Sequence, residues 1–160
     1  HLLCARLRPS NMDAAKGSLK ELERIVGQIR ERWPDVQIIV RGDSGFARDD
    51  LMTWCEDNGV DYIFGFSRNS RIVRKILTQL KKAKKRFWKT GRAARYYRDF
   101  KYRTLKSWSR TRRVVGKAEQ LSKGENPRFV VTSLSKEEFS AQELYEDLYC
   151  ARGDMENRIK

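Results

Sequence analysis

Residues 36–46 read VQIIVRGDSGF, a short β-branched run followed at once by an acid between two glycines. Such runs are typical of strands covered on both faces, and Gly42 and Gly45 allow the chain to turn sharply where the strand ends. In an open α/β sheet, ligands bind at the carboxyl ends of strands, so Asp43 is a candidate site residue. Asp is also favoured in turns and helix caps, and local sequence alone favours that structural role.

The segments on either side of this strand alternate between helix and strand patterns. Upstream, residues 2–7 predict a strand, and apolar residues at three- and four-residue steps predict a helix over residues 11–33. Downstream, a helix is predicted from Asp49 or Asp50 to Asn58, and residues 61–66, DYIFGF, predict another strand. This β-α-β-α-β order predicts an α/β domain with a mainly covered sheet.

The charge of the chain is positive and concentrated in one part of it. The 160 residues carry 35 Lys or Arg against 21 Asp or Glu, a net charge of +14. Residues 66–113 alone hold 19 Lys or Arg and one acid, which makes +18 locally. Such a segment favours a polyanionic partner, with nucleic acid ahead of an anionic membrane surface. No apolar stretch approaches the roughly 18 residues of a membrane span, and we expect no signal peptide and a cytoplasmic protein.

The basic segment combines a helix with strands. Residues 70–86 have a helical pattern that ends in a Lys and Arg cluster, and residues 95–105, 107–117 and 128–132 predict antiparallel strands. We expect part of residues 80–94 to be disordered without DNA, since runs of like charge are usually solvated or mobile. The candidate DNA-contacting residues in this segment are Lys81, Lys82, Lys84, Lys85, Arg86, Trp88, Trp108, Arg110, Arg112 and Arg113.

The two tryptophans have alternative roles. Each could stack on a flipped or unpaired base, or pack in the core. Core packing is slightly favoured for Trp108, which sits in an alternating strand pattern. The two roles are evenly balanced for Trp88, which follows the charge cluster.

The last segment predicts a helix that carries a second candidate acid. Ser140 and Glu143 have the spacing of a capping box, and the helical pattern continues toward Ile159. Tyr149 and Arg152 stand seven and four residues before Glu156, so all three share one face of this helix. The alternative is that Glu156 is a solvated side chain and that its pair with Arg152 is an ordinary surface contact.

The remaining composition excludes several kinds of chemistry. The single histidine is His1, so Ser-His and Cys-His mechanisms have almost no material. The three cysteines, Cys4, Cys55 and Cys150, are not spaced as paired ligands, which argues against structural zinc and fits buried thiols in a reducing compartment. If the chain belongs to an enzyme, carboxylates must carry the chemistry.

Several motifs, taken together, resemble one family. These are residues 7–11 (LRPSN), residues 40–46 (VRGDSGF), residues 51–56 (LMTWCE), residues 59–62 (GVDY), and Tyr149, Arg152 and Glu156 in the tail. They resemble the bacterial insertion-sequence transposases of the DDE class, in the branch with a Tyr-Arg-Glu-Lys signature. The resemblance is strong over residues 1–70 and 140–160 and weak through the basic middle.

The resemblance implies a ribonuclease H-like core with a mainly β, strongly basic insertion between the second and third acidic residues. Residues 1–69 would be the first part of the core, 70–135 the insertion and 136–160 the helix with the third acid. Three carboxylates would hold two Mg²⁺ ions, for which Mn²⁺ can substitute, with Asp43 as the second acid and Glu156 as the third. Tyr149 and Arg152 would contact phosphate near the scissile bond. The first acid would lie upstream of His1 and the signature Lys at position 163, so we expect the isolated piece to be inactive.

The function implied is metal-dependent DNA cleavage and strand transfer at transposon ends. The partners would be double-stranded terminal repeats and target DNA, with a homodimer in the DNA complex and a location at the bacterial nucleoid. A non-catalytic basic nucleic-acid-binding module, in which the acids are structural, is the alternative. A nuclease of the same fold without transposition is a third possibility.

Overall fold

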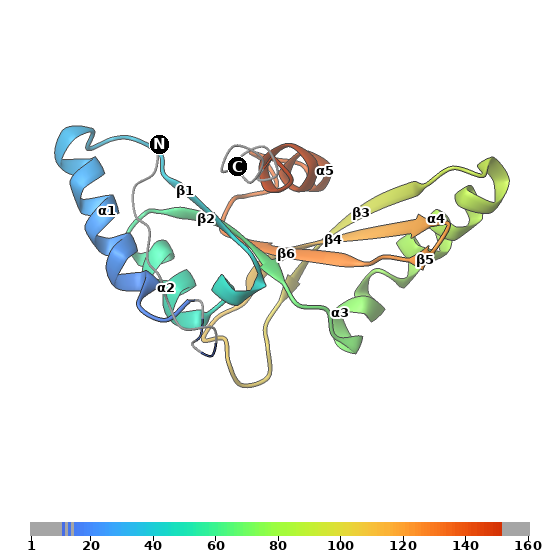
Figure 1. Ribbon diagram of the computed structural model, residues 1–160, viewed down its shortest axis with the longest axis horizontal. Coiled ribbons are helices and arrows are strands. Elements are labelled where there is room, and N and C mark those ends of the chain that lie inside the picture. Colours follow the sequence, from blue (N-terminus) through green and yellow to red (C-terminus); the bar gives the residue numbers. More distant parts are fainter. Residues whose placement is uncertain (1–10, 12, 14, 152–160) are drawn as a thin grey trace.

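One mixed sheet organises the chain in this computed structural model, which describes residues 11, 13 and 15–151. Its strand order is β1-β2-β6-β4-β3, and the short β5 pairs with β4 (Figure 1). The pair β1–β2 is parallel and the other pairs are antiparallel. The strands are β1 (Ile39–Gly42), β2 (Asp61–Phe66), β3 (Ala94–Tyr102), β4 (Arg112–Leu121), β5 (Gly124–Glu125) and β6 (Arg128–Thr132).

Helices cover both faces of this sheet. One face carries α1 (Ser18–Arg32), α2 (Asp49–Asp57), α3 (Ser70–Lys75) and α4 (Leu77–Thr90). The opposite face carries α5 (Ala141–Glu143) and the π-helical segment η2 (Leu144–Tyr149), which continues it (Figure 1). A short 3₁₀ turn, η1 (Ser44–Phe46), follows β1. None of the helices within the described residues is long and apolar enough to cross a bilayer.

The strand residues alternate between two apolar clusters. Tyr62 and Phe64 of β2 face the cluster under α2, α3 and α4, whereas Ile63 faces the cluster under α5 and η2. All three side chains are fully buried. A strand with both faces covered needs apolar residues at successive positions, which explains the continuous run in β2. The prediction of an α/β domain with a covered sheet is confirmed.

Several elements fall where the sequence predicts them and others are displaced. The strands over 61–66 and 128–132 match the prediction, and α2 begins at Asp49, one of the two predicted starts. Strand β4 begins at Arg112, five residues after its predicted start. Helix α1 begins at Ser18 because Gly17 has a φ of 76°, a left-handed conformation that cannot continue a helix. Strand β1 begins at Ile39, where pairing with Asp61 of β2 starts. The strand predicted over residues 2–7 and the end of the last helix lie outside the described residues.

The basic middle of the chain is a helix pair and a long hairpin. The helical pattern over 70–86 breaks at Ile76 and then runs on to Thr90, so residues 80–90 are helical instead of disordered. Gly116 of β4 accounts for the break, because a Cβ there would lie 2.7 Å from the Ile76 side chain. The missing side chain therefore lets the helix junction approach the sheet. The chain then returns along β3 and β4, which pair over nine residues from Ala94 to Tyr102.

The strands of the predicted insertion belong to the same sheet as the core strands. β2 pairs with β6 over four residues, and β6 pairs with β4. The sheet is therefore continuous from β1 to β3 (Figure 1). A mixed sheet with helices on both faces is compatible with a ribonuclease H-like core. The division at residues 69 and 135 stays a prediction.

Candidate functional site

Asp43 lies where the parallel strands β1 and β2 end. Its Oδ1 accepts a hydrogen bond from the Gly45 N–H at 2.8 Å, so the carboxylate caps the η1 turn. This is the structural role that local sequence favours. Among the hydrogen bonds between described residues, Oδ2 of this exposed carboxylate accepts none. Within the described residues, the capping contact therefore uses one oxygen of this exposed carboxylate.

The same carboxylate also lines an open pocket of about 510 Å³. The pocket combines one acid with two cations and aromatic walls. Its lining comes from the ends of β1 and β2, the start of β6 and the η2 helix: Asp43, Ser44, Gly65, Phe66, Ser67, Arg68, Asn126, Pro127, Arg128, Phe129, Tyr145 and Tyr149. Four separate elements converge at this edge of the sheet, which is where an open α/β sheet binds ligands.

Gly65 allows two of those elements to meet. It follows Phe64, the β2 partner of Gly42, so it stands beside Asp43. A Cβ on Gly65 would lie 2.7 Å from the Tyr149 hydroxyl, 3.0 Å from the Ser44 amide nitrogen and 3.2 Å from the Asp43 carbonyl carbon. The latter two are backbone atoms that cannot rotate away. The absence of a side chain here therefore brings the Tyr149 phenol next to the Asp43 loop.

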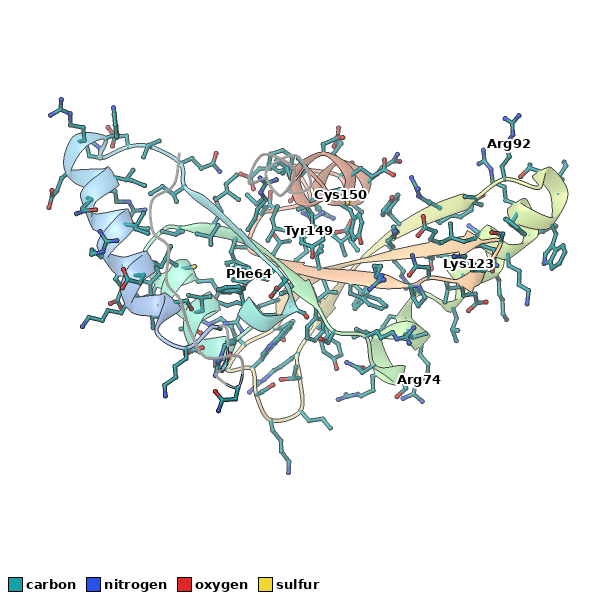
Figure 2. The ribbon with its side chains drawn as sticks, viewed as in Figure 1. Phe64, Arg74, Arg92, Lys123, Tyr149 and Cys150 are labelled. Atoms are coloured by element: carbon teal, nitrogen blue, oxygen red, sulfur yellow. The ribbon has the colours of Figure 1, made fainter. Side chains whose placement is uncertain are left out.

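Tyr149 belongs to an aromatic row that holds η2 on the sheet. Its ring lies 5.5 Å from the ring of Tyr145, which lies 5.7 Å from that of Tyr97 on β3. Figure 2 places Tyr149 between the C-terminal helical segment and the sheet. On the other side, Nη1 of Arg41 in β1 donates a hydrogen bond to the Leu148 carbonyl. The end of η2 is thus held to both β1 and β3, over the carboxyl ends of the parallel strands.

The capping box at the start of this helical segment is confirmed. The Ser140 hydroxyl accepts from the Glu143 N–H, and the Glu143 carboxylate accepts from the Ser140 N–H. These contacts lower the pKa of the Glu143 carboxyl. The first turn is therefore fixed by local sequence, and the packing of Leu144 and Tyr145 on the sheet orients the η2 segment.

The structure brings two of the predicted site residues together, Asp43 and Tyr149. Arg152 and Glu156 lie outside the described residues. Within the described residues, no group of three or more His, Cys, Asp or Glu side chains is placed to hold a metal ion. Asp43 is a hard oxygen donor of the type that Mg²⁺ prefers, and it is the single carboxylate among the residues that line this pocket. The described part of the site therefore supplies one ligand, not a complete cation site.

The guanidinium of Arg112 is enclosed by the fold. Its side chain is 2% exposed and lies 2.6 Å from an Asp49 oxygen and 2.6 Å from a Glu56 oxygen. Thr53 accepts another hydrogen bond from Nη2, and the Trp108 ring lies 5.6 Å from Cζ. Burial opposes the charge, but Glu56 and Asp49 raise the pKa of Arg112 above its ordinary value. We therefore leave Arg112 out of the proposed DNA-contacting set.

Two neighbours of Arg112 are also paired, to different extents. Arg113 is 13% exposed, pairs with Asp99 at 2.6 Å, and donates to the carbonyls of Leu134, Ser135 and Phe139. It joins β4 to the segment before α5, so we leave it out as well. Arg110 is 47% exposed and pairs with Glu56 and Asp57 at 3.3 and 3.4 Å. Because half of it is accessible, it stays a predicted DNA contact.

The remaining candidates separate by exposure. Trp108 is 4% exposed and packs between Phe66 and Tyr102, so it serves the core and cannot stack on a base. Trp88 is 74% exposed near the end of α4. The cluster Lys81, Lys82, Lys84, Lys85 and Arg86 lies on the exposed side of the same helix, whose Leu80 and Ala83 are buried.

The sequence analysis missed three residues of the pocket that matter here. Gly65 gives no signal until the neighbouring elements are known. Arg68 and Arg128 line the pocket with Asp43. Arg68 follows the end of β2 by two residues, so the rule that sites gather at strand ends could have singled it out beside Asp43.

Comparison with known proteins identifies the family of the chain. A family model described as "Transposase DDE domain group 1" matches residues 1–160. No curated protein sequence matches the chain. Because the match spans the whole chain, this protein belongs to the transposase DDE domain family.

Proposed function

We propose that this DDE transposase domain cleaves DNA strands at transposon ends and joins them to a target duplex, with Asp43 and Glu156 as two of its metal-binding carboxylates. We further propose that the domain comes from a bacterial insertion sequence of the Tyr-Arg-Glu-Lys signature branch and acts at the nucleoid in the cytoplasm. The proposal rests on one observation above the others. Tyr149, the first residue of that signature, lines the same pocket as Asp43 although 106 positions separate them.

The position of Asp43 suits a metal ligand. One carboxylate oxygen caps the η1 turn and thereby orients the group, and the residue lines the pocket. Tyr149 and Glu156 are seven residues apart, a spacing that puts them on one face of a helix. We propose that Glu156 reaches the same pocket and that a third carboxylate completes the set. Two divalent ions, Mg²⁺ or Mn²⁺, would supply water activation and stabilisation of the leaving oxygen.

The other polar residues of the pocket would position the DNA. Arg68 and Arg128 bring positive charge to the rim, beside the acid. The phenol of Tyr149 can donate to a phosphate oxygen, and Arg152 would add a planar guanidinium. The exposed cations of α4, together with Trp88 and Arg110, would bind the flanking duplex. A second copy of the chain would take part in the DNA complex.

The test is a cleavage assay with the protein that contains this segment, on a plasmid carrying the ends of its own element, with MgCl₂. Asp43→Asn and Glu156→Gln should abolish cleavage, by at least about 100-fold, because each removes a charged ligand. Both variants should still retard an end-containing duplex in EDTA. Asp147→Asn is the matched control, since Asp147 is an exposed acid of η2 outside the pocket lining.

The outcomes separate the proposed function from its alternatives. Full cleavage by Asp43→Asn would contradict the proposal. If the wild-type protein binds DNA but does not cleave it, a non-catalytic nucleic-acid-binding module is favoured. The exposed lysines of α4 could bind DNA in such a module as well. Cleavage without joining of the cut 3′ end to a target duplex would indicate a nuclease.

A further inference from the structure

A second pocket lies on the same side of the sheet as α3 and carries only positive charge. Its volume is about 430 Å³, between α3 and the end of β3. The lining residues are Arg71, Arg74, Lys75, Lys101, Tyr102 and Arg103. Five of the six are cations and none is an acid. No prediction from the sequence singled out any of them.

The cations of this pocket are gathered at one place with no acid in its lining. Among the described residues, none of the five forms an ion pair with a carboxylate. By contrast, Arg95, Arg110 and Lys117 each lie within 4 Å of a carboxylate. Like charges held together without counter-charge raise the free energy of the folded state, and an anion bound between them lowers it.

The pocket is also preorganised. The Arg71 guanidinium lies 5.9 Å from the centre of the buried Tyr102 ring, a cation–π arrangement. Nε of Arg103 donates to the Trp108 carbonyl at 3.1 Å. Arg98 on β3 donates to the Lys75 carbonyl and ties β3 to the end of α3. Two guanidinium groups are thus oriented before any ligand arrives, which reduces the side-chain entropy lost on binding.

The location relates this pocket to the one that contains Asp43. Arg68 lines the Asp43 pocket and Arg71, three residues later, lines the basic pocket. Their Cα atoms can be at most about 11 Å apart. One strand rises 3.4 Å per base pair along a duplex, so roughly three base pairs span that distance. The two arginines therefore lie within the length of a short duplex segment. Figure 2 shows Arg74 on the outer side of α3, accessible from solvent.

We propose that the basic pocket formed by Arg71, Arg74, Lys75, Lys101 and Arg103 binds the phosphate backbone of DNA next to the segment held at Asp43. The inference rests on the proposed function for the identity of the polyanion. The chemistry recognised is a row of phosphodiesters, which guanidinium groups bind through paired hydrogen bonds. No base edge is read, so the pocket adds affinity and register but no sequence preference.

The test compares two charge-matched double variants of the chain in EDTA, so that no cleavage takes place. Arg71→Gln with Arg74→Gln removes two pocket cations, and Lys20→Gln with Arg32→Gln removes two exposed cations of α1. Duplex binding is measured by fluorescence anisotropy from 0.05 to 0.3 M NaCl. The pocket variant should bind roughly 10-fold more weakly at 0.1 M salt, with a slope of log K on log salt about 1.8 smaller.

The control variant should keep the wild-type slope, and Arg71→Lys with Arg74→Lys should restore it because the charges return. All four substituted positions are exposed, so the variants should fold. Equal losses in the pocket and control variants would overturn the proposal, since net charge alone would explain them.

Two further arms separate the sources of phosphate. Inorganic phosphate, compared with NaCl at equal ionic strength, should not displace the duplex. If phosphate displaces the duplex from the wild-type protein but not from the pocket variant, the pocket is a free-phosphate site and the proposal is overturned. Vesicles of phosphatidylcholine with phosphatidylglycerol should bind wild type and pocket variant alike, and a pocket-dependent preference for vesicles over duplex would also overturn it. Because EDTA removes catalysis, a failure here leaves the cleavage test of Asp43 unaffected, and the reverse is also true.

Discussion

The start of β4 and the end of β3 carry basic residues that differ in their carboxylate partners. At the start of β4, Arg112 is buried and pairs with Asp49 and Glu56, and the half-buried Arg113 pairs with Asp99. Lys101 and Arg103, at the paired end of β3, line the basic pocket and have no carboxylate partner among the described residues. The sequence shows both as one unbroken basic segment. A high density of positive charge therefore does not identify a DNA-contacting surface until the acids that neutralise it are known.

The largest expected effect is at a neutralised cation. Arg112→Ala should lower the free energy of unfolding by about 3–5 kcal/mol, because it removes the buried guanidinium that pairs with both Asp49 and Glu56. Urea denaturation at pH 7 would measure it. A loss below about 1 kcal/mol would mean that the pair is solvated and that the contrast between the two regions is wrong.

The two tryptophans show a similar contrast, between a buried and an exposed side chain, without charge. Trp108→Ala should cost about 3 kcal/mol of unfolding free energy, because its buried ring packs on Phe66 and Tyr102. Trp88→Ala should change stability by less than about 0.5 kcal/mol, since this ring is 74% exposed. Thermal denaturation of both variants checks the prediction, and equal losses would contradict it.

A buried acid should make the neutralised region sensitive to pH. Burial of Glu119 opposes its ionisation, but Lys117, Arg95 and Asn126 donate to it and lower its pKa to about 2. Because the folded pKa lies below the model-peptide value of 4.5, its stabilisation is complete above that pH. The stabilisation is lost as the pH falls toward 2.

Glu119→Gln should therefore reduce the unfolding free energy by about 2–3 kcal/mol at pH 7. The difference from wild type should shrink as the pH falls toward 2 and disappear below it, where both side chains are neutral. Urea titrations at several pH values would measure the difference. A gap that persists at low pH would assign the effect to packing instead of charge.

The smallest effect is expected at a cation without a carboxylate partner. Arg74→Ala should change the free energy of unfolding by no more than about 0.5 kcal/mol, because Arg74 is exposed and contributes no ion pair among the described residues. A slight gain in low salt would agree with relief of repulsion in the pocket. A loss comparable to that of Arg112→Ala would show that the pocket is structural.

Local patterns were sufficient for most elements of the fold. The buried run of β2, the β-branched run of β6 and the capping box at Ser140 each specify their own element. The errors came from contacts between distant residues. Ile76 interrupts a helical pattern because Gly116 on β4 leaves room for its side chain. Residues 80–90 are helical because Leu80 and Ala83 are buried against the sheet. Neither contact can be read from the helix itself.

The candidate site was predictable only in part for the same reason. Asp43 could be chosen because a strand end, two glycines and an acid coincide in one short stretch. The approach of Tyr149 depends on Gly65, and the roles of Arg71 and Arg112 depend on which acids fold beside them. Those neighbours lie far away along the chain, so residue spacing carries no information about them.

We propose that folding brings Asp43 and Glu156 to one cation site. Metal-directed cleavage of the polypeptide would test this proximity. Fe²⁺ with ascorbate, added to the protein that contains this segment, should cut the backbone near residues 43 and 156 together. Excess Mg²⁺ should suppress both cuts, and Asp43→Asn should remove both. A cut near one position alone, or cuts at 156 that survive Asp43→Asn, would contradict a shared site.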